Sequence, residues 1–439
     1  MKRQLLALTV GAALITTACT GAGPTPTPTP TAPSAAFPEG SVAVIPPQPG
    51  VPVELWRGEP DTVAIPLTGE PDLLVIGPMP GKGARRVSVV DWRAGRELWH
   101  ADAAECGSAA VAGAKLACAT AEGVDWYDLR SGGAPTRTPL PRLKQLQQLT
   151  DKSAVAFLTS PSIEADQDAT TEPATFGVLT PEEVSWQREV LFQGEVTDVL
   201  WLGVEGGMVF ALRNEDWAVW MAAAATATGD SVSIPDQATP PMRIPGTSRL
   251  AFSTANPPVT YLTDLDGRQV ASADGGPTWS SRHASLAPMA NDGSVPAIPV
   301  AATDAVGLDL LRADGQRVSV TTSQALPIGL CGGILYALTS EGDASAPTYG
   351  LRALEPDGTT LWDEAGAGSF PVGAFCDGTR LLVEAFPQDK PATLTAYAEQ
   401  GKVWSTEPHV PAEPGQSLAV AGAGLLVNGE GAPRMLGSR

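Results

Sequence analysis

Short apolar segments separated by turn residues run through most of the chain. Residues 370–374, 381–385 and 393–397 are examples, and Gly, Asp, Pro and other turn-forming residues lie between them. The 41 prolines and 46 glycines are spread along the whole length and leave few segments with the period of an amphipathic helix. Short apolar segments bounded by turn residues are typical of β-strands. The pattern therefore predicts an all-β fold.

One pattern recurs: an apolar strand, a turn containing Asp and Gly, and a second strand that often begins with an aromatic residue. The most complete copy spans residues 89–99, with Asp91 and Gly95 in the turn and Trp99 on the second strand. Further copies lie at residues 124–132, 261–270, 308–318, 351–362 and 393–404, and weaker ones at 176–186 and 220–232. Successive turns are roughly 37 to 51 residues apart, which matches the period of β-propeller blades.

Each repeat has room for four strands. A strand pair cannot bury both of its faces alone, but sheets stacked radially bury them against each other. The Trp of each second strand would then fill the space between neighbouring blades. We predict a β-propeller of about eight four-stranded blades, with seven as the alternative.

Both ends of this region are expected to share one blade. Residues 41–56 resemble a further outer hairpin, and residues 416–428 resemble an inner pair of strands that needs partners. Pairing them would close the ring and remove free sheet edges. Because nine blades would be unusual, one of the weaker copies is expected to be an elaboration and not a blade, which gives the predicted count of about eight.

The stretch from Asp91 to Trp99 resembles the repeat of PQQ-like, quinoprotein-type β-propellers. That family closes each blade with Asp-x-x-x-Gly-Lys-x-x-Trp, and Arg96 stands here at the Lys position. Partial copies lie at 128–132, 357–362 and 401–404, so the resemblance covers most of residues 40–439. In enzymes of that family it implies a quinone in the central funnel, a Ca²⁺ site of carboxylate and amide oxygens, an Asp base and, in one group, adjacent cysteines. This chain has no adjacent cysteines, and we match no such ligand set onto it.

The N-terminus predicts export. Lys2 and Arg3 precede an almost wholly apolar run from Leu5 to Ile15, which is too short to span a membrane and is typical of a signal peptide. The following Thr16-Thr17-Ala18-Cys19 resembles the lipobox of bacterial lipoproteins, although that family prefers Leu where Thr16 stands. The resemblance implies lipidation of Cys19 with a diacylglycerol thioether and fatty acyl chains such as palmitate. The alternative is an ordinary cleaved signal peptide with an incidental cysteine.

A proline-rich tether follows. Residues 24–31 alternate Pro and Thr, and proline excludes both helix and sheet ladder, so an extended polyproline-II spacer is expected. The domain organisation is therefore a signal peptide at 1–18, a lipid anchor and linker at 19–38, and the propeller domain at 39–439.

Four further cysteines fit an oxidising compartment. Cys106 and Cys118 flank residues 111–113, which could form a hairpin loop with Gly113 in the left-handed conformation and place the two cysteines opposite each other. We predict this disulfide. Cys331 and Cys376 would then pair by elimination, with two free buried thiols as the alternative.

The net charge of −20 disfavours nucleic acid and anionic lipid headgroups as partners. Candidate chemistry is sparse. The stretch 264–267 has carboxylates that suggest a calcium loop, but a plain turn is favoured because further spaced oxygens are lacking. Gly415-Gln416-Ser417-Leu418-Ala419 imitates a nucleophile elbow, yet a hairpin strand fits its context better.

No catalytic, cofactor-binding or metal-binding residue is therefore predicted. We expect a lipid-anchored protein on the extracytoplasmic side of the cell membrane whose propeller is a non-catalytic scaffold for a protein or carbohydrate partner in the envelope. The alternative is a quinone-dependent oxidoreductase or another propeller enzyme.

Overall fold

The computed structural model divides the chain into a unit of residues Met1–Ala35 and a unit of residues Ala36–Arg439, and everything described below belongs to the second. The described residues are 37–438 apart from 40, 79–85, 103, 150–151, 161, 164–169, 173, 191–198, 206–207, 214–218, 225–241, 256, 266–267, 276–288, 302–306, 322–324, 342–347, 366–370, 386–392, 407–417, 423 and 429–431.

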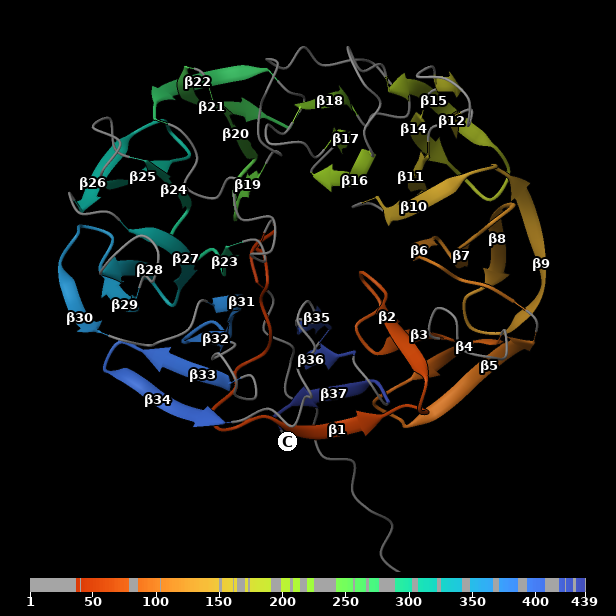
Figure 1. Cartoon of the computed structure of the whole chain (residues 1–439), viewed down its shortest axis with the longest axis horizontal. Coiled ribbons are helices and arrows are strands. Elements are labelled where there is room, and N and C mark those ends of the chain that lie inside the picture. Colours follow the sequence, from red (N-terminus) through yellow and green to blue (C-terminus); the bar gives the residue numbers. More distant parts are fainter. Residues whose placement is uncertain are drawn as a thin grey trace, which may run out of the picture. The chain divides into compact units, whose positions relative to one another are not determined.

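Over these residues the second unit is an all-β propeller with no helix. They form nine sheets of three to five strands and one two-stranded ribbon. The sheets follow one another around a common centre (Figure 1). We number them as blades 1 to 9 and call the strands of a full blade first to fourth from the centre outward.

Blade 1 contains β2 (Thr62–Pro66), β3 (Leu73–Pro78), β4 (Arg86–Asp91) and β5 (Arg96–Asp102). Blade 2 contains β6 (Ala109–Ala112), β7 (Lys115–Thr120), β8 (Gly123–Asp128) and β9 (Gly132–Pro139). Blade 3 contains β10 (Leu143–Gln148), β11 (Val155–Thr159), β14 (Ala174–Leu179) and β15 (Val184–Val190), with the separate ribbon β12 (Ser162–Ile163) and β13 (Thr170–Glu172) in its chain segment. Blade 4 contains β16 (Val199–Glu205), β17 (Met208–Arg213) and β18 (Val219–Ala224).

Blade 5 contains β19 (Met242–Ile244), β20 (Arg249–Ala255), β21 (Pro258–Asp264) and β22 (Gln269–Asp274). Blade 6 contains β24 (Ala297–Ala301), β25 (Leu308–Arg312) and β26 (Arg317–Thr321). Blade 7 contains β27 (Leu326–Cys331), β28 (Ile334–Glu341), β29 (Thr348–Leu354) and β30 (Thr360–Glu364), and β23 (Ala290–Asn291) joins it in parallel beside β27. Blade 8 contains β31 (Pro371–Cys376), β32 (Leu381–Ala385), β33 (Thr393–Ala398) and β34 (Gly401–Thr406).

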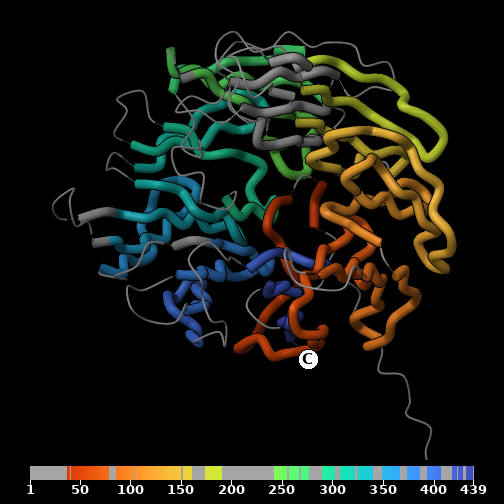
Figure 2. The backbone as a smooth tube through the Cα atoms, turned by 45° about the vertical axis from the view of Figure 1, so that its right-hand side comes forward, coloured from red at the N-terminus to blue at the C-terminus, as the bar shows by residue number. Residues whose placement is uncertain are grey.

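Blade 9 joins the two ends of the propeller. Its strands are β35 (Ala419–Ala421), β36 (Gly424–Val427), β37 (Arg434–Gly437) and, outermost, β1 (Val53–Arg57) from the start of the chain. The expectation that both ends share a blade is confirmed, because β1 and β37 pair antiparallel with Trp56 opposite Met435. Both figures show the red and blue ends together in this blade (Figures 1 and 2).

Two details differ from the sequence reading. Both weaker copies of the repeat belong to blades of their own, the copy at 176–186 on β14 and β15 and the described part of the copy at 220–232 on β18, so neither is an elaboration and the described residues form one blade more than the predicted eight. Residues 41–56 do not form an outer hairpin, because only β1 joins blade 9 and its partner strand comes from residues Arg434–Gly437.

Buried apolar side chains fill the junctions between successive blades. Trp99, Leu116 and Tyr127 belong to one cluster between blades 1 and 2. Leu74 and Met435 belong to another, which joins blade 1 to blade 9 and so closes the ring. Clusters of this kind bury the faces that a single blade leaves open.

The predicted role of the repeated tryptophans is confirmed at two junctions. The Trp99 ring of blade 1 stacks on Tyr127 of blade 2 with 5.3 Å between ring centroids. The Trp362 ring of blade 7 stacks on Tyr397 of blade 8 at 5.6 Å. Aromatic pairs in this distance range add stability beyond that of buried area alone. No helix that is long and apolar enough to cross a membrane occurs in the part of the chain that the structure describes.

Candidate functional site

An N-terminal strap, residues 37–39 and 41–48, crosses the turns between the first and second strands of several blades. The Glu39 carbonyl accepts a hydrogen bond of 2.8 Å from Gly246 N in the first turn of blade 5, and its carboxylate forms an ion pair with Arg243. Val42 then exchanges two backbone hydrogen bonds of 2.9 Å with Asn291. The segment can be followed in red toward β1 in Figure 1.

The strap continues onto blade 8. Cys376 N donates to Ala43 O at 2.9 Å, and Ile45 N donates to Cys376 O at 2.8 Å. The Ile45 side chain is fully buried. Gln48 N donates to Asp377 Oδ2 at 2.8 Å. These contacts tie the strap to blades 5, 7 and 8 before the chain enters β1 of blade 9.

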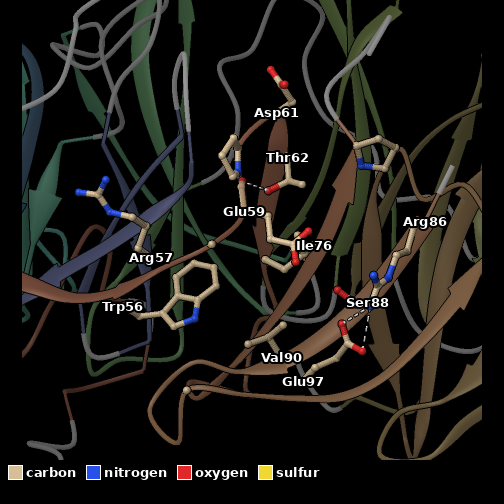
Figure 3. Close-up of a pocket in the computed structure, with 14 residues that line it drawn as sticks. Trp56, Arg57, Glu59, Asp61, Thr62, Ile76, Arg86, Ser88, Val90 and Glu97 are labelled. Atoms are coloured by element: carbon tan, nitrogen blue, oxygen red, sulfur yellow. Dashed lines mark hydrogen bonds and ion pairs between the residues drawn. The ribbon is translucent and has the colours of Figure 1, made fainter. Parts of the chain in front are cut away.

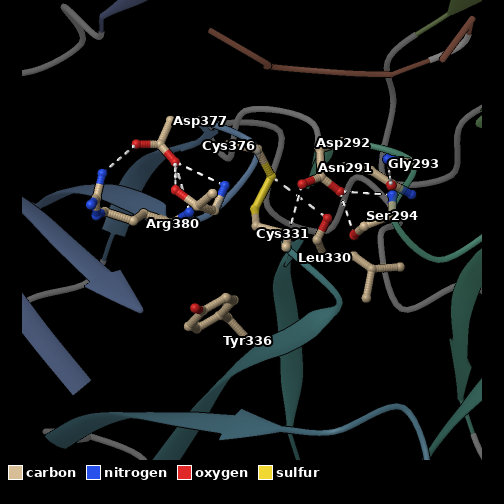
Figure 4. The surroundings of a disulfide bond; sticks show 12 residues. Asn291, Asp292, Gly293, Ser294, Leu330, Cys331, Tyr336, Cys376, Asp377 and Arg380 are labelled. Carbon is tan, nitrogen blue, oxygen red and sulfur yellow. Dashed lines mark hydrogen bonds and ion pairs between the residues drawn. A yellow bond between two sulfur atoms is a disulfide. The ribbon is translucent and has the colours of Figure 1, made fainter. Parts of the chain in front are cut away.

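A disulfide lies under the strap. Cys331 ends β27 of blade 7 and Cys376 ends β31 of blade 8, with their Cα atoms 5.5 Å apart and both side chains fully buried. The predicted pairing is confirmed, and the alternative of two free thiols is wrong. Figure 4 shows two carboxylates beside this bond, Asp292 and Asp377.

Both carboxylates accept hydrogen bonds from backbone N–H groups in the turns around the disulfide. Asp292 Oδ2 accepts from Gly332 N at 2.7 Å, and Asp377 Oδ1 accepts from Arg380 N at 2.7 Å. Asp377 is fully buried. Because buried carboxylates are costly unless they accept hydrogen bonds, these two groups have a structural role in fixing the inner turns.

The second disulfide joins Cys106 and Cys118, with 4.7 Å between their Cα atoms. The pairing is confirmed, but the register behind the prediction is wrong. Cys118 pairs with Ala109 across a tighter hairpin whose loop contains Gly113, at a φ of 58°. Gly107 N donates to Ala119 O, and Ala119 N donates to Ser108 O, both at 2.9 Å. This irregular pairing brings Cys106 back toward Cys118.

A groove of about 750 Å³ lies between blade 9 and blade 1. Its lining comes from the end of β1, the connection to β2, and the strands of blade 1 (Figure 3). The lining residues are Trp56, Arg57, Gly58, Glu59, Pro60, Asp61, Thr62, Ile76, Pro78, Arg86, Ser88, Val90, Gly95 and Glu97. A volume of this size is within the usual range of ligand sites.

The groove follows from one small residue on blade 1. The register between the third and fourth strands shifts at one equivalent position in blades 1, 2 and 8. Val90 stands at this position in blade 1, Tyr127 in blade 2 and Tyr397 in blade 8. The two tyrosines stack on the tryptophan of the preceding blade. Val90 meets Trp56 in the same place, and valine has no ring to cover the indole.

Charged side chains border the groove. Arg86 Nη2 and Glu97 Oε2 form an ion pair of 2.8 Å on neighbouring strands, and His100 Nδ1 lies 2.7 Å from Glu97 Oε1. Arg57 forms an ion pair of 2.6 Å with Glu54, and this hydrogen bond lowers the pKa of the Glu54 carboxyl. Both ion pairs are partly exposed to solvent, so they orient side chains more than they stabilise the fold.

One buried carboxyl lies outside both regions. Glu384 on β32 is 1% exposed, and its Oε2 accepts a hydrogen bond of 3.0 Å from Leu418 N. Burial raises the pKa of Glu384 to about 7. Removal from water disfavours the charged form, and a single backbone donor compensates only in part.

The other candidate sites from the sequence, Cys19, residues 264–267 and residues 415–419, have different outcomes. Cys19 lies outside the described residues, so its lipidation stays a prediction. The turn reading of 264–267 agrees with Asp264, whose Oδ1 accepts from Arg268 N at 2.8 Å, although residues 266 and 267 are not described. Ser417 of the elbow-like stretch is not described, and β35 begins at Ala419. Among the residues that the structure covers, no group of three or more His, Cys, Asp or Glu side chains could hold a metal ion.

The groove and the strap were not predicted from the sequence. A usable signal exists for the groove, because aligning the repeats places Val90 where Tyr127 and Tyr397 stand. The strap has no such signal, since it depends on isolated backbone bridges between residues far apart in the chain.

No protein-family profile matches this chain, and no curated protein sequence is significantly similar to it. Several solved structures share the propeller architecture. BamB from Moraxella catarrhalis aligns over 89% of this chain and 98% of its own, with 12% identity and a TM-score of 0.44. The C-terminal WD40 domain of Sif2 aligns over 89% and 99%, with 8% identity and a TM-score of 0.43. Quinohemoprotein alcohol dehydrogenase from Comamonas testosteroni aligns over 92% and 76%, with 11% identity and a TM-score of 0.41.

Proposed function

We propose that this protein is a cell-envelope lipoprotein whose PQQ-like propeller is a non-catalytic scaffold for an extracytoplasmic partner. The observation that carries the proposal is the groove between blades 9 and 1, which has a half-buried tryptophan and charged side chains in its walls. Concave sites with an apolar wall and a few polar groups are typical binding sites. The disulfides suit an oxidising compartment outside the cytoplasm.

The strap lies at one end of the blades. Phe37 lies against Gly378 in the first turn of blade 8, and Pro38 lies against Gly246 in the first turn of blade 5. Residues Gly58–Asp61 connect an outermost strand to an innermost one, and in an antiparallel blade that connection lies at the opposite end from the first turn.

Replacement of the lipidated cysteine tests the anchor. The Cys19→Ser protein should leave the membrane fraction for the medium or accumulate as an uncut precursor, because the acyl chains supply the predicted membrane affinity. Fractionation of cells expressing each form, followed by immunoblotting, measures this. Equal membrane association of the variant and the wild type would refute the anchor.

A second experiment tests the scaffold. The anchored protein is captured from solubilised envelope, co-purifying proteins and glycans are identified, and binding is repeated with purified components. A stoichiometric complex supports the proposal, and failure to reconstitute any complex refutes it. The alternative, a quinone-dependent oxidoreductase, predicts instead that quinone with Ca²⁺ raises the melting temperature, since a ligand that binds only the folded state stabilises it.

A further inference from the structure

At the junction between blades 9 and 1, Val90 stands at the position where two comparable junctions have a tyrosine ring. Trp99 and Trp362 each stack on a tyrosine of the next blade, with interplanar angles of 27° and 26°. Each indole N–H also donates to a backbone carbonyl of that blade, at 3.0 Å to Leu129 O and 2.9 Å to Ala398 O. At both junctions, the face of the tryptophan ring therefore binds a tyrosine ring.

Trp56 is the tryptophan of blade 9, and it lines an open groove instead of meeting a ring. Gly58 keeps the indole in this place, since a Cβ atom there would lie 2.8 Å from Trp56 Cη2 and 2.8 Å from Pro433 Cγ. The apolar side chains of Ile76 and Val90 complete the wall opposite (Figure 3). A planar ring that enters here can stack on Trp56 as the tyrosines do elsewhere.

The charges around this space favour a cationic ligand. Three lining residues are acidic, Glu59, Asp61 and Glu97, and two are basic, Arg57 and Arg86. Each arginine is already paired with a carboxylate, Arg57 with Glu54 and Arg86 with Glu97. Including Glu54 and its second partner Arg434, four carboxylates face three guanidinium groups, so the local charge is negative, as is that of the whole chain at −20.

We propose that this groove binds an aromatic side chain carried on a basic, extended segment of a partner protein. The inference rests on the proposed scaffold function and names its binding site and the chemistry of its partner. The ring takes the position that Tyr127 and Tyr397 occupy at their junctions, and the flanking Lys or Arg side chains meet the carboxylates of Glu59 and Asp61. Aromatic anchors in such pockets commonly dominate the energetics of protein interfaces.

Val90→Tyr is the decisive variant, because it supplies from within the chain the ring that the groove lacks. The variant should fold, with a melting temperature equal to or above that of the wild type, and should no longer accept an external ring. Loss of binding without loss of stability separates this outcome from misfolding. Val270→Tyr is the matched control, since Val270 is 46% exposed on β22 of blade 5 and lies outside the groove.

The probe is the peptide acetyl-Lys-Lys-Tyr-Lys-Lys-amide, observed by saturation-transfer NMR and titrated against the complete propeller. We expect transfer to the tyrosine ring with wild type and Val270→Tyr, and about tenfold weaker binding or none with Val90→Tyr and Trp56→Ala. A peptide with Ala in place of Tyr should lose binding, and one with Glu in place of Lys should be weakened.

Three results would overturn the proposal: equal binding to Val90→Tyr, equal binding of the alanine peptide, or no binding of the tyrosine peptide to wild type. Binding of cell-envelope oligosaccharides at the groove in place of the peptide would also overturn it. The proposed function fails separately. If the peptide binds as expected but no partner complex can be reconstituted, the proposed binding site in the groove is supported and the proposed scaffold function is refuted. If a partner binds Val90→Tyr normally, the scaffold stands and the groove is not its site.

Discussion

Trp99→Ala is expected to destabilise the propeller by about 3–5 kcal/mol, the usual cost of removing a large buried aromatic side chain. Trp99 is 8% exposed, stacks on Tyr127, and donates its indole N–H to Leu129 O. Both contacts cross from blade 1 to blade 2. The cost therefore reports on cohesion between blades and not on the pairing of strands within one blade.

Trp99→Phe separates the contribution of the ring stack to the free energy of unfolding from that of the indole hydrogen bond. A phenyl ring keeps part of the stack but leaves Leu129 O without the indole donor, which should cost about 1–3 kcal/mol for a buried acceptor. Trp56→Ala is the control at the corresponding position of blade 9, where no tyrosine covers the indole, and it should cost clearly less than Trp99→Ala.

Guanidinium unfolding followed by circular dichroism measures these differences. It suits the purpose better than melting, because in a domain of some four hundred residues each kcal/mol shifts Tm by only about 1 °C. If Trp99→Ala costs no more than Trp56→Ala, the argument that repeated tryptophans hold neighbouring blades together is incorrect.

Two further predictions concern a buried acid and the disulfides. The raised pKa of Glu384 means that the folded state keeps its proton up to about pH 7, whereas the unfolded state loses it near 4.5, so stability falls as pH rises between these values. Glu384→Gln should remove this loss and be more stable by about 3 kcal/mol above pH 7, but not below pH 4.5, in urea titrations across pH. Replacing both cysteines of Cys331–Cys376 with Ser should cost about 4 kcal/mol, and those of Cys106–Cys118 about 3, because the separations are 45 and 12 residues.

Each of these predictions has a clear contrary result. A Glu384→Gln stability difference that stays constant with pH would show that Glu384 has an ordinary pKa in the folded state. If the two serine double variants unfold at the denaturant concentration of wild type, the disulfides do not restrict the unfolded chain as argued.

The propeller architecture could be predicted from the sequence because its blades repeat one sequence pattern. Turns with Gly, and in most copies Asp, recur at the blade period, and in three copies they are followed by Trp99, Trp362 or Trp404. Each copy marks the outer part of one blade. The sharing of a blade between both ends also followed from the need to cover edges. The blade count was one too low because one of the weaker copies, at 176–186 and 220–232, was taken as an elaboration, whereas each belongs to a blade of its own.

The details that define the site depend on exact register and on distant contacts. Cys106 was paired with Cys118 correctly, but a tighter turn at Gly113 with irregular pairing before β6 replaced the expected hairpin. Strand register is decided by tertiary contacts as well as by turn residues. The groove depends on the difference between Val90 and a tyrosine, which has meaning only once the neighbouring Trp56 has been placed.

The pairing of β1 with β37 imposes an order on folding. One strand comes from Val53–Arg57 and its partner from Arg434–Gly437, so the ring cannot close until residues 434–437 have been synthesised. Bringing such distant segments together carries a loop-closure entropy that only the completed junctions on both sides of blade 9 can offset. A chain truncated after Pro433 would lose all of β37 and leave β1 without its partner strand. Such a product would expose a sheet edge, and proteases and chaperones recognise chains in that state.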